Sequence, residues 1–455
     1  LFLLILCNAA IGQNYKLAKQ KSNILLNAYI KTANVPGLSV AISIGDKIVY
    51  SNSFGYSDID LKKAAVNSTE YRIGSVTKLF TALATVKLID EDIIKSSDLV
   101  SKYIPGLPDS YQSMTIAELA SHTAGIRHYT RDEIMSANAV EYADLEDGLS
   151  KFINDTLLSN PGEKYSYSSY GYVLLGAVLE NAYRKKFLDI IDELVLVPSG
   201  MTNTSPEFPG RTYPDMSRFY YPPKDTVFII AEGENYSYKW PAGGYLSTAT
   251  DLAKFGSYMI SGEFDENNIL SLLFKPQKTN DGKDINVGYG FRIGTDNKGR
   301  KVVHHGGESQ GARAFILIYP EYKLTVAMTA NVFRAPLFEG EAETLAGYFL
   351  KDYKFKKNLL PKSIRFSTTY NNNPANVEIK TIEKKITGMT KTDIPIIDIV
   401  QDGSKIRVMA LSSSGIINFW LIKDGETLKG KWGYDKETTD LKFPIINSKR
   451  PSKIN

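Results

Sequence analysis

The stretch at 72–91, RIGSVTKLFTALATVKLIDE, constrains the fold of this chain more than any other part of it. Its apolar residues recur at i, i+3, i+4 and i+7 from Val76, which is the spacing of a helix with a buried face. Gly74 stands just before them and suits a turn from a strand into that helix. We therefore expect a buried helix that follows a strand, with a domain built around it.

Ser75 and Lys78 stand three residues apart at the start of this helix. Residues with this spacing lie on the same helical face, one turn from each other. A serine hydroxyl needs a base within hydrogen-bond reach to act as a nucleophile, and a lysine whose pKa is lowered by burial can be that base. The helix N-terminus adds a free backbone N–H where an oxyanion would form. The alternative is an ordinary helix start with an exposed lysine, since such tetrapeptides are common.

The size and composition of the chain indicate an ordinary globular protein. With 455 residues, two domains are expected. A hydrophobic fraction of 43% and a charged fraction of 23% allow a large core. The formal net charge of +4 is small for this length, and no basic cluster is interleaved with aromatic residues. These features argue against a nucleic-acid binder.

The first residues, LFLLILC followed by NAAIGQ, match the apolar core and cleavage region of a signal peptide over 1–12. The small-x-small pattern ending at Gly12 places cleavage before Gln13, and the missing Met and basic residues indicate a truncated N-terminus. The alternative is a buried apolar strand. Cys7 is the single cysteine, so the mature chain would have no disulfide and no catalytic thiol. We expect an exported bacterial protein, periplasmic or extracellular, with no transmembrane helix in the mature chain, because no later apolar run approaches ~20 residues.

Strand patterns are predicted on both sides of the helical part of the chain. A helix is expected from Tyr15 to Thr32, and GLSVAISIGDKIVYSNSFGYSD then alternates as two strands joined at Gly45 and Asp46. Strand candidates return at Val287 and are separated by Gly, Pro and Asn.

The segments between these strands are mostly helical. The exception is 198–238, which is rich in Pro and Tyr and is expected to be a long surface loop over a cleft. A last helix is expected over 337–350. Beta, helical, then beta sequence around one helix predicts an α/β or α+β domain over 15–350, closed by strands from both ends.

A second domain is predicted after this one. The lysine-rich segment KDYKFKKNLLPK at 351–362 is expected to be a linker. The remainder, 363–455, has short strand candidates with turns at Gly403, Gly425 and Gly433, which predicts a small all-β sandwich or half-barrel. It carries no motif that assigns a role.

Two further segments carry chemistry when they are taken together with S-x-x-K. One is PGEKYSYSSYGYVLLG, which contains Tyr167, Ser168 and Ser169. The other is HHGG, from His304 to Gly307, at the end of a strand candidate.

In this order and with these separations, the three motifs resemble those of the serine beta-lactamase and penicillin-binding protein superfamily, in its class C, carboxypeptidase and esterase branch. That branch carries S-x-x-K, then Y-x-N within P-G-x-x-[FY]-x-Y-S-N-x-G-Y-x-L-L-G, then a strand with K-T-G or H-x-G. ASHTAGIRHY and PAGGYLSTATDLAKF resemble further blocks of the family, the first in its mitochondrial branch. The resemblance covers about 15–350. It implies a beta-lactamase/transpeptidase-like fold, an antiparallel sheet flanked by helices with a helical subdomain.

The resemblance also implies a serine hydrolase that acts through an acyl-enzyme on an ester, amide or peptide bond, as a peptidase, carboxypeptidase, esterase or beta-lactamase. Ser75 would be the nucleophile, and Lys78 with Tyr167 would take its proton and later activate water. A phenol needs a neighbouring cation to ionise near neutral pH. Backbone N–H groups of Ser75 and Gly307 would form the oxyanion hole. The implied partner is a small-molecule or peptide substrate, no cofactor is implied, and the oligomeric state is open.

Two residues depart from the family motifs. Ser169 replaces the Asn of Y-x-N, so a contact with substrate or lysine would be lost, although the mitochondrial branch also has a small hydroxyl residue there. His304 stands for the Lys of K-T-G, with Gly306 as the glycine. Imidazole has an unperturbed pKa of ~6.5 and is mostly neutral at pH 7, so it would hold a substrate carboxylate less firmly than lysine does. This favours an ester or a different peptide as the substrate over penicillins and D-Ala-D-Ala peptides. His305 would point to the opposite side of the strand and be structural.

Other polar residues near these motifs are expected to be structural. His122 and His128 would shape the loop beside the site, and Arg313 would form an ion pair. With four His and no H-E-x-x-H motif, an ordinary zinc site cannot be assembled.

Two alternatives to this mechanism follow from other features of the sequence. GESQG at 307–311 matches the nucleophile elbow of α/β-hydrolases, but that motif requires a following helix and a later histidine. ARAFILIYP predicts a strand instead, and no histidine follows His305. The second alternative is a catalytically idle relative that acts as a scaffold or sensor. The intact Ser75, Lys78 and Tyr167 argue against it, and Ser169 leaves it open.

Overall fold

The computed structural model describes residues 15–444 apart from short gaps. These gaps are residues 131, 134–139, 226, 234, 262–268, 297, 336–337, 351–362, 371–372, 382, 391–392, 403–404, 413–414, 425–426 and 435–436. The predicted signal peptide at 1–12 and the predicted linker at 351–362 therefore lie outside the described residues. The chain divides into a first unit, Val35–Phe338, and a second unit that combines Leu1–Asn34 with Glu339–Asn455.

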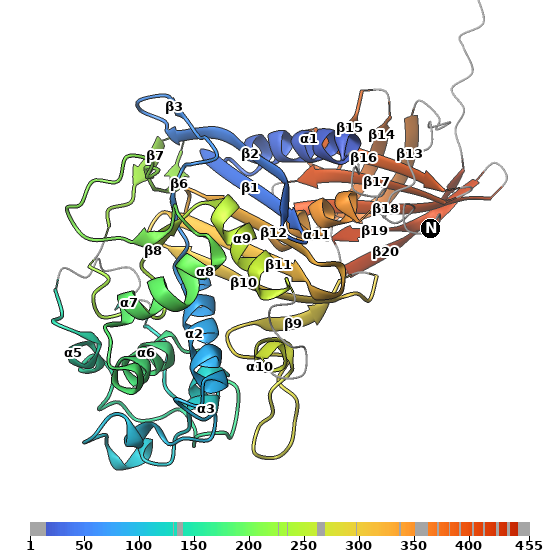
Figure 1. Ribbon diagram of the computed structural model, residues 1–455. Coiled ribbons are helices and arrows are strands. Elements are labelled where there is room, and N and C mark those ends of the chain that lie inside the picture. The colour runs from blue at the N-terminus through green and yellow to red at the C-terminus, as the bar shows by residue number, and fades with distance from the viewer. Residues whose placement is uncertain are drawn as a thin grey trace, which may run out of the picture. The chain divides into compact units, whose positions relative to one another are not determined.

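The first unit is built on a seven-stranded antiparallel sheet with the order β3-β2-β1-β12-β11-β10-β9 (Figure 1). Its strands are β1 (Gly37–Ile44), β2 (Lys47–Asp58), β3 (Lys63–Ala64), β9 (Arg292–Thr295), β10 (Lys301–Ser309), β11 (Ala312–Tyr319) and β12 (Leu324–Ala330). β1 pairs with the distant β12, with Leu38 opposite Ala330. The prediction that strands from both ends of the domain form one sheet is confirmed. The predicted hairpin at Gly45 is also present, with the positive φ of 59° that a tight turn favours.

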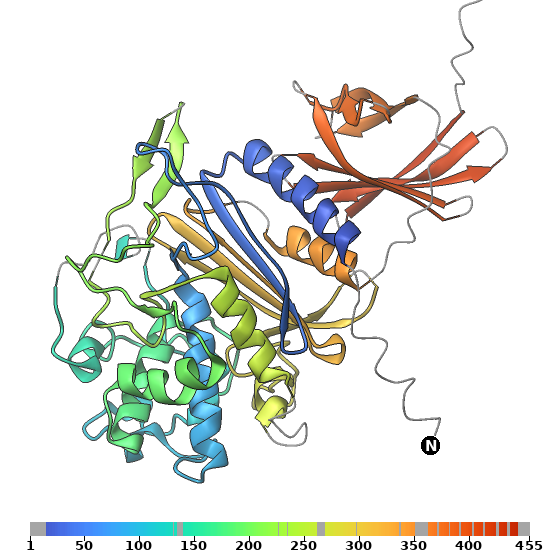
Figure 2. The same cartoon turned by 45° about the horizontal axis from the view of Figure 1, so that its top comes forward.

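Helices pack on this sheet and extend from it into a helical subdomain (Figures 1 and 2). They are η1 (Gly74–Thr77), α2 (Lys78–Asp90), η2 (Val100–Lys102), η3 (Asp109–Tyr111), α3 (Ile116–Ala120), α5 (Leu145–Leu149), α6 (Ser169–Tyr183), α7 (Phe187–Ile191), η4 (Asp192–Leu196), α8 (Val197–Ser199), α9 (Ala249–Met259), α10 (Ile269–Phe274) and η5 (Pro320–Tyr322). α9 packs on β1, β11 and β12, whereas α2 packs among α6, α7, α10 and η4.

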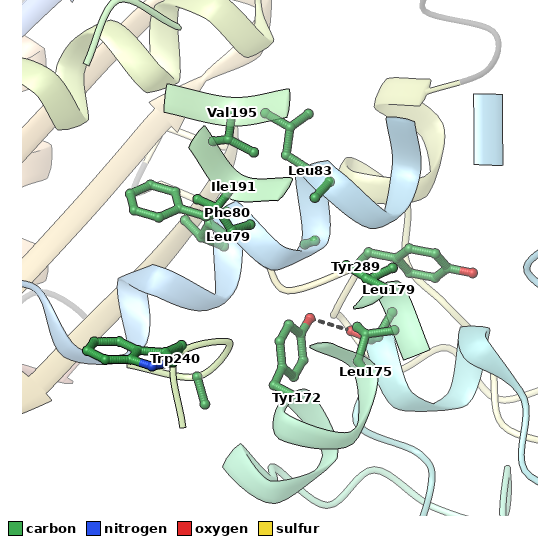
Figure 3. Close-up of a cluster of buried hydrophobic side chains, with 14 of the residues drawn as sticks. Leu79, Phe80, Leu83, Tyr172, Leu175, Leu179, Ile191, Val195, Trp240 and Tyr289 are labelled. Atoms are coloured by element: carbon green, nitrogen blue, oxygen red, sulfur yellow. Dashed lines mark hydrogen bonds between the residues drawn. The ribbon is translucent and has the colours of Figure 1, made fainter. Parts of the chain in front are cut away.

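α2 is buried on every side rather than on one face. Each residue from Lys78 to Val86 is buried, as expected of a helix that is apolar around its whole circumference. Leu79, Phe80 and Leu83 lie among side chains of α6 and of the 187–196 segment (Figure 3). Burial of each large apolar side chain contributes about 1.5–3 kcal/mol. The helix that begins at Lys78 is therefore a rigid support for the residues at its start.

The segment expected to be a loop, 198–238, contains regular structure, so that prediction is wrong in part. β5 (Ser205–Pro206) pairs with β8 (Tyr245–Ser247), which also pairs with β4 (Tyr71–Arg72). β6 (Tyr220–Lys224) and β7 (Val227–Ile230) form a separate hairpin. Pro residues are tolerated there because a two-stranded hairpin consists of edge strands.

The second unit contains an eight-stranded antiparallel sheet in sequence order, β13 to β20. Its strands are β13 (Ser363–Tyr370), β14 (Asn373–Lys380), β15 (Lys385–Thr387), β16 (Ile394–Asp402), β17 (Lys405–Ser412), β18 (Gly415–Asp424), β19 (Thr427–Tyr434) and β20 (Glu437–Pro444). β13 and β20 come into contact, so the sheet is curled. The predicted all-β C-terminal region is confirmed for the part that the structure describes, which ends at Pro444.

Two helices belong with this curled sheet. They are α1 (Lys16–Thr32) and α11 (Phe338–Phe349), which the sequence-based boundaries placed with the hydrolase domain. α1 packs against β16 and β17, and Lys21 forms an ion pair with the buried Asp398. Among the described residues, no helix has both the length and the apolar composition of a membrane span.

Candidate active site

Ser75 and Lys78 face each other at the start of α2. Ser75 lies in η1 and is half-buried, and Lys78 is 0% exposed. The Lys78 Nζ lies 3.0 Å from the Ser75 Oγ and donates a hydrogen bond of 3.0 Å to the carbonyl of Ala242. The predicted pair is thus within hydrogen-bond distance, and the serine is the more accessible member.

The environment of Lys78 favours a neutral amine. Burial lowers the pKa of Lys78 well below its ordinary value, and the positive charges of Lys239 and Arg292 lower it further. A neutral amine has a lone pair that can accept the serine proton, while one of its hydrogens stays on the Ala242 carbonyl. Lys78 is therefore prepared to act as a base.

The Ser75 turn is in backbone contact with strand β10. A Cβ atom on Gly307 would stand 1.9 Å from the Ile73 carbonyl oxygen and 3.0 Å from the Val76 nitrogen. Glycine at Gly307 is therefore required by the close approach of two backbones. This contact places the Gly307–Glu308 backbone beside the turn that carries Ser75.

Tyr167 lies beside Lys78 in the candidate site. It precedes α6, and the Lys78 Nζ lies 5.1 Å from the centroid of its ring. Burial raises the pKa of Tyr167 to about 12, and hydrogen bonding with the Ser75 hydroxyl offsets this only in part. The phenol is therefore protonated at neutral pH. This environment disfavours the expected role of Tyr167 as an ionised base. It favours a role in which the phenol donates a proton.

Ser169 is the first residue of α6 and is buried, with 1% of its surface exposed. Hydrogen bonding with Ser169 acts against the larger effect of burial, which raises the pKa of Tyr167. Ser168 caps the helix, because its Oγ accepts a hydrogen bond of 2.9 Å from the Gly171 N–H. Ser168 thus caps the helix, whereas the Ser169 side chain lies beside the Tyr167 phenol.

The two adjacent histidines of β10 are oriented opposite to the prediction. His305 is buried, and its ring centroid lies 6.0 Å from that of Tyr167. His304 lies on the other face, 5.6 Å from the ring of Phe315, and Gly306 shares that face. Successive residues of a strand point to opposite sides, so His305 and Gly307 lie on the Ser75 side. The assignment of His304 and Gly306 to this side of the strand was wrong.

His305 is neutral in this position. Its Nδ1 lies 2.6 Å from the Gly306 carbonyl oxygen, which can only accept, so Nδ1 carries the proton. Burial lowers the pKa of His305 well below its ordinary value, and the positive charge of Arg292 acts in the same direction. The Nε2 atom is then an acceptor.

Three contributors to the site were not identified from the sequence. Lys239 and Arg292 supply positive charge near Lys78, and Ala242 supplies a carbonyl. The PAGGYLST block pointed to the Ala242 region but not to the role of its backbone. Arg313 forms the expected ion pair, at 3.7 Å from Glu308.

The structure also bears on the alternative sites. The GESQG segment connects β10 to β11 without a helix, and Ser309 lies 3.2 Å from the Tyr236 hydroxyl. This geometry is not that of a nucleophile elbow. Within the described part of the chain, no group of three or more His, Cys, Asp or Glu side chains is placed to hold a metal ion.

Comparison with known proteins identifies relatives of this chain among penicillin-binding proteins and similar proteins. Penicillin-binding protein 4* of Bacillus subtilis (strain 168) is 27% identical over 314 residues, which cover 64% of this chain and 67% of that protein. Protein flp of Staphylococcus aureus (strain NCTC 8325 / PS 47) is 26% identical over 322 residues, which cover 69% of this chain and 63% of that protein. The chain thus matches about two thirds of the length of these relatives.

Two solved structures share the fold. An octameric penicillin-binding protein homologue from Pyrococcus abyssi aligns with a TM-score of 0.64 and 22% identity, over 90% of this chain and 97% of that one. A penicillin-binding protein from Bacillus halodurans aligns with a TM-score of 0.59 and 21% identity, over 72% of this chain and 98% of that one. The Beta-lactamase family matches residues 25–348, which is more than half of the chain. The chain therefore belongs to the beta-lactamase family, within the serine beta-lactamase and penicillin-binding protein superfamily.

Proposed function

We propose that this chain is a serine hydrolase that forms an acyl-enzyme on Ser75 from an ester, amide or peptide bond. The observation that carries the proposal is the 3.0 Å distance between Lys78 Nζ and Ser75 Oγ, at a lysine with no exposed surface. Family membership supports a hydrolase of this general type. The roles of the individual residues are part of the proposal.

Acylation would begin at the Ser75–Lys78 pair. The neutral Lys78 amine accepts the hydroxyl proton while the Ser75 Oγ bonds to the substrate carbonyl carbon. The negative charge moves to the carbonyl oxygen, where backbone N–H groups of Ser75 and of the Gly307–Glu308 segment would stabilise it.

Collapse of the tetrahedral intermediate breaks the bond to the leaving group. Tyr167 would donate the proton that the leaving group takes, and the Lys78 ammonium would then reprotonate the phenol. Deacylation reverses these roles: Lys78 accepts a proton from water, the hydroxide bonds to the acyl carbon, and Ser75 regains its proton as the acid leaves. Every proton is thus returned within one turnover.

The substrate is proposed to be a small molecule or a peptide. Neutral His305 faces Tyr167 and would hold a carboxylate less firmly than lysine, which favours an ester or an uncommon peptide over a penicillin. We also propose that the protein acts outside the bacterial cytoplasm, on the basis of the signal-like sequence at 1–12.

The proposal is tested with covalent probes of active-site serines. A fluorophosphonate or a fluorescent penicillin should label the protein, and Ser75→Ala should abolish the labelling. Ser309→Ala is the matched control, because it removes the serine of the GESQG segment, and it should retain labelling. Absence of labelling by both probes, together with no hydrolysis of p-nitrophenyl esters, would overturn the proposal and favour an idle scaffold or sensor.

A further inference from the structure

Tyr167 is surrounded by imidazole rings that the proposed chemistry does not use. The His122 ring centroid lies 4.5 Å from that of Tyr167 with an interplanar angle of 41°. The His128 centroid lies 5.2 Å away at 71°. Both histidines belong to one segment, ASHTAGIRHY at 120–129.

The two rings bind the backbone that follows Tyr167. The Ser168 N–H donates to the Nδ1 of His122 at 3.2 Å, and the Ser169 N–H donates to the Nδ1 of His128 at 3.1 Å. These N–H groups lie at the start of α6, where intrahelical partners are missing. Consecutive backbone groups beside the phenol are thus held by two side chains of one loop.

The same loop also holds the backbone before Tyr167. The Ser166 N–H donates to the His122 carbonyl at 2.8 Å. The Ser168 Oγ donates to the Arg127 carbonyl at 2.7 Å. Tyr167 is therefore fixed on both sides by the loop that carries the histidines.

Each histidine can accept at Nδ1 only in its neutral form, with the proton on Nε2. Burial lowers the pKa of His122 well below its ordinary value and that of His128 to about 4, and the positive charge of Arg292 also lowers the pKa of His122. Glu133 opposes the shift of His128, whereas Lys239 and Arg127 add to it. The accepting form is therefore present at neutral pH.

The backbone conformation and the buried Nε2 atom of His122 are both unfavourable for the stability of the fold. Its φ of 60° is in the left-handed region, which is unfavourable for a side chain with a Cβ. It is 3% exposed, and its Nε2 has no hydrogen-bond partner among the described residues. An apolar side chain in place of His122 would not bury an N–H group without an acceptor. Unfavourable features of this kind gather at functional sites.

We propose that His122 and His128 are positioning residues for Tyr167. Their Nδ1 atoms hold the backbone of Ser168 and Ser169 and thereby keep the phenol against the reactive pair. The inference rests on the proposed function, because both histidines act through Tyr167.

The decisive comparison is His128→Asn against His128→Leu. The Asn Oδ1 lies close to where Nδ1 stands and can accept the Ser169 N–H, whereas Leu has a comparable volume and no acceptor. His128→Asn should keep kcat/KM for a p-nitrophenyl ester within about 5-fold of wild type, and His128→Leu should lower it by roughly 100-fold, the effect expected of a misplaced catalytic group. His128→Ala replaces the Leu variant if that one does not fold. Equal losses in the Asn and Leu variants would overturn the inference.

A second readout separates positioning from general stability. In a Tyr167→Phe background, His128→Leu should lower kcat/KM by less than about 3-fold, because the group that it positions is already absent. An undiminished loss of about 100-fold in that background would show that His128 acts independently of the phenol. If Tyr167→Phe alone leaves kcat/KM unchanged, the role of Tyr167 fails and this inference fails with it. Loss of Ser75 labelling is a separate result, which concerns the proposed function itself.

Discussion

Gly307 of β10 lies so close to Ile73 that a Cβ atom on it would stand 1.9 Å from the Ile73 carbonyl oxygen. The contact is reciprocal, because a Cβ on Gly74 would stand 2.3 Å from the Glu308 carbonyl oxygen. The turn that carries Ser75 and the strand opposite it are thus joined backbone to backbone. This contact fixes the two segments that would supply the oxyanion hole.

Gly307→Ala should therefore separate the turn from β10. We expect labelling by a fluorophosphonate probe to slow by roughly 100-fold, because a misplaced oxyanion donor costs about 2.7–4 kcal/mol in the transition state. Gly306→Ala is the matched control, since its Cβ would lie 3.6 Å from Phe315, an ordinary contact. Equal labelling rates in the two variants would contradict the assignment.

Lys78→Met should remove the base and preserve the fold. We expect acylation to fall by about 10²–10⁴-fold, the usual contribution of general-base catalysis. Thermal unfolding should stay at or above the wild-type temperature, because burying an amine without an opposite charge is unfavourable. Lys87→Met, near the other end of the same helix, is the control and should acylate normally. A wild-type acylation rate in Lys78→Met would remove the lysine from the mechanism.

His305→Ala should impair the enzyme more than His304→Ala. His305 lies on the Ser75 face beside Tyr167, whereas His304 lies beside Phe315 on the other face. We expect kcat/KM for p-nitrophenyl esters to fall at least 10-fold in His305→Ala and to change less than about 3-fold in His304→Ala. The reverse order would restore the assignment made from the sequence.

Acid should destabilise the protein through its buried histidines. Burial is the main cause that lowers the pKa of His128 to about 4 and those of His122 and His305 well below their ordinary value. Between about pH 6.5 and pH 4 the unfolded chain binds protons that the folded chain does not. The contribution of the neutral histidines to the free energy of unfolding is therefore complete above pH 6.5. It is lost as the pH falls, by up to about 1.4 kcal/mol per pH unit for each histidine.

Urea unfolding at several pH values measures this dependence. His128→Asn should reduce the slope of unfolding free energy between pH 6.5 and pH 5 by up to one histidine's share. The lowered pKa of Glu133, about 2, acts in the same direction but at lower pH, below the ordinary range of a carboxylate. If His128→Asn leaves this slope unchanged, the pKa of His128 is not lowered in the folded protein, and the prediction is contradicted.

Much of the fold could be predicted because local patterns and global structure agree. The strands on either side of the helical region do join in one sheet, and the 72–91 stretch contains the central helix, α2. Its burial on all sides was missed, because apolar spacing identifies one buried face and cannot show what packs on the other. Periodicity also could not assign α1 to the unit that contains the C-terminal sheet, because that grouping depends on long-range contacts.

The residues of the site could be predicted where a motif allows only one assignment of its residues. Ser75 and Lys78 come together because they are three apart on a helical turn. HHGG offers two registers, and strand alternation shows that His304 and His305 point apart without showing which of them faces the serine. The contributions of Lys239 and Ala242 depend on distant segments, and the second is a backbone carbonyl, which every residue possesses.

The most direct test of the account is the site of acylation. The protein would be mixed with p-nitrophenyl esters, β-lactams and D-amino peptides, quenched rapidly, and analysed by intact mass and by peptide mapping. We predict an acyl adduct with at least one compound, carried on the peptide that contains Ser75 and absent in Ser75→Ala. An adduct on Ser309 or on any other residue, or no adduct with the whole panel, would contradict the central claim.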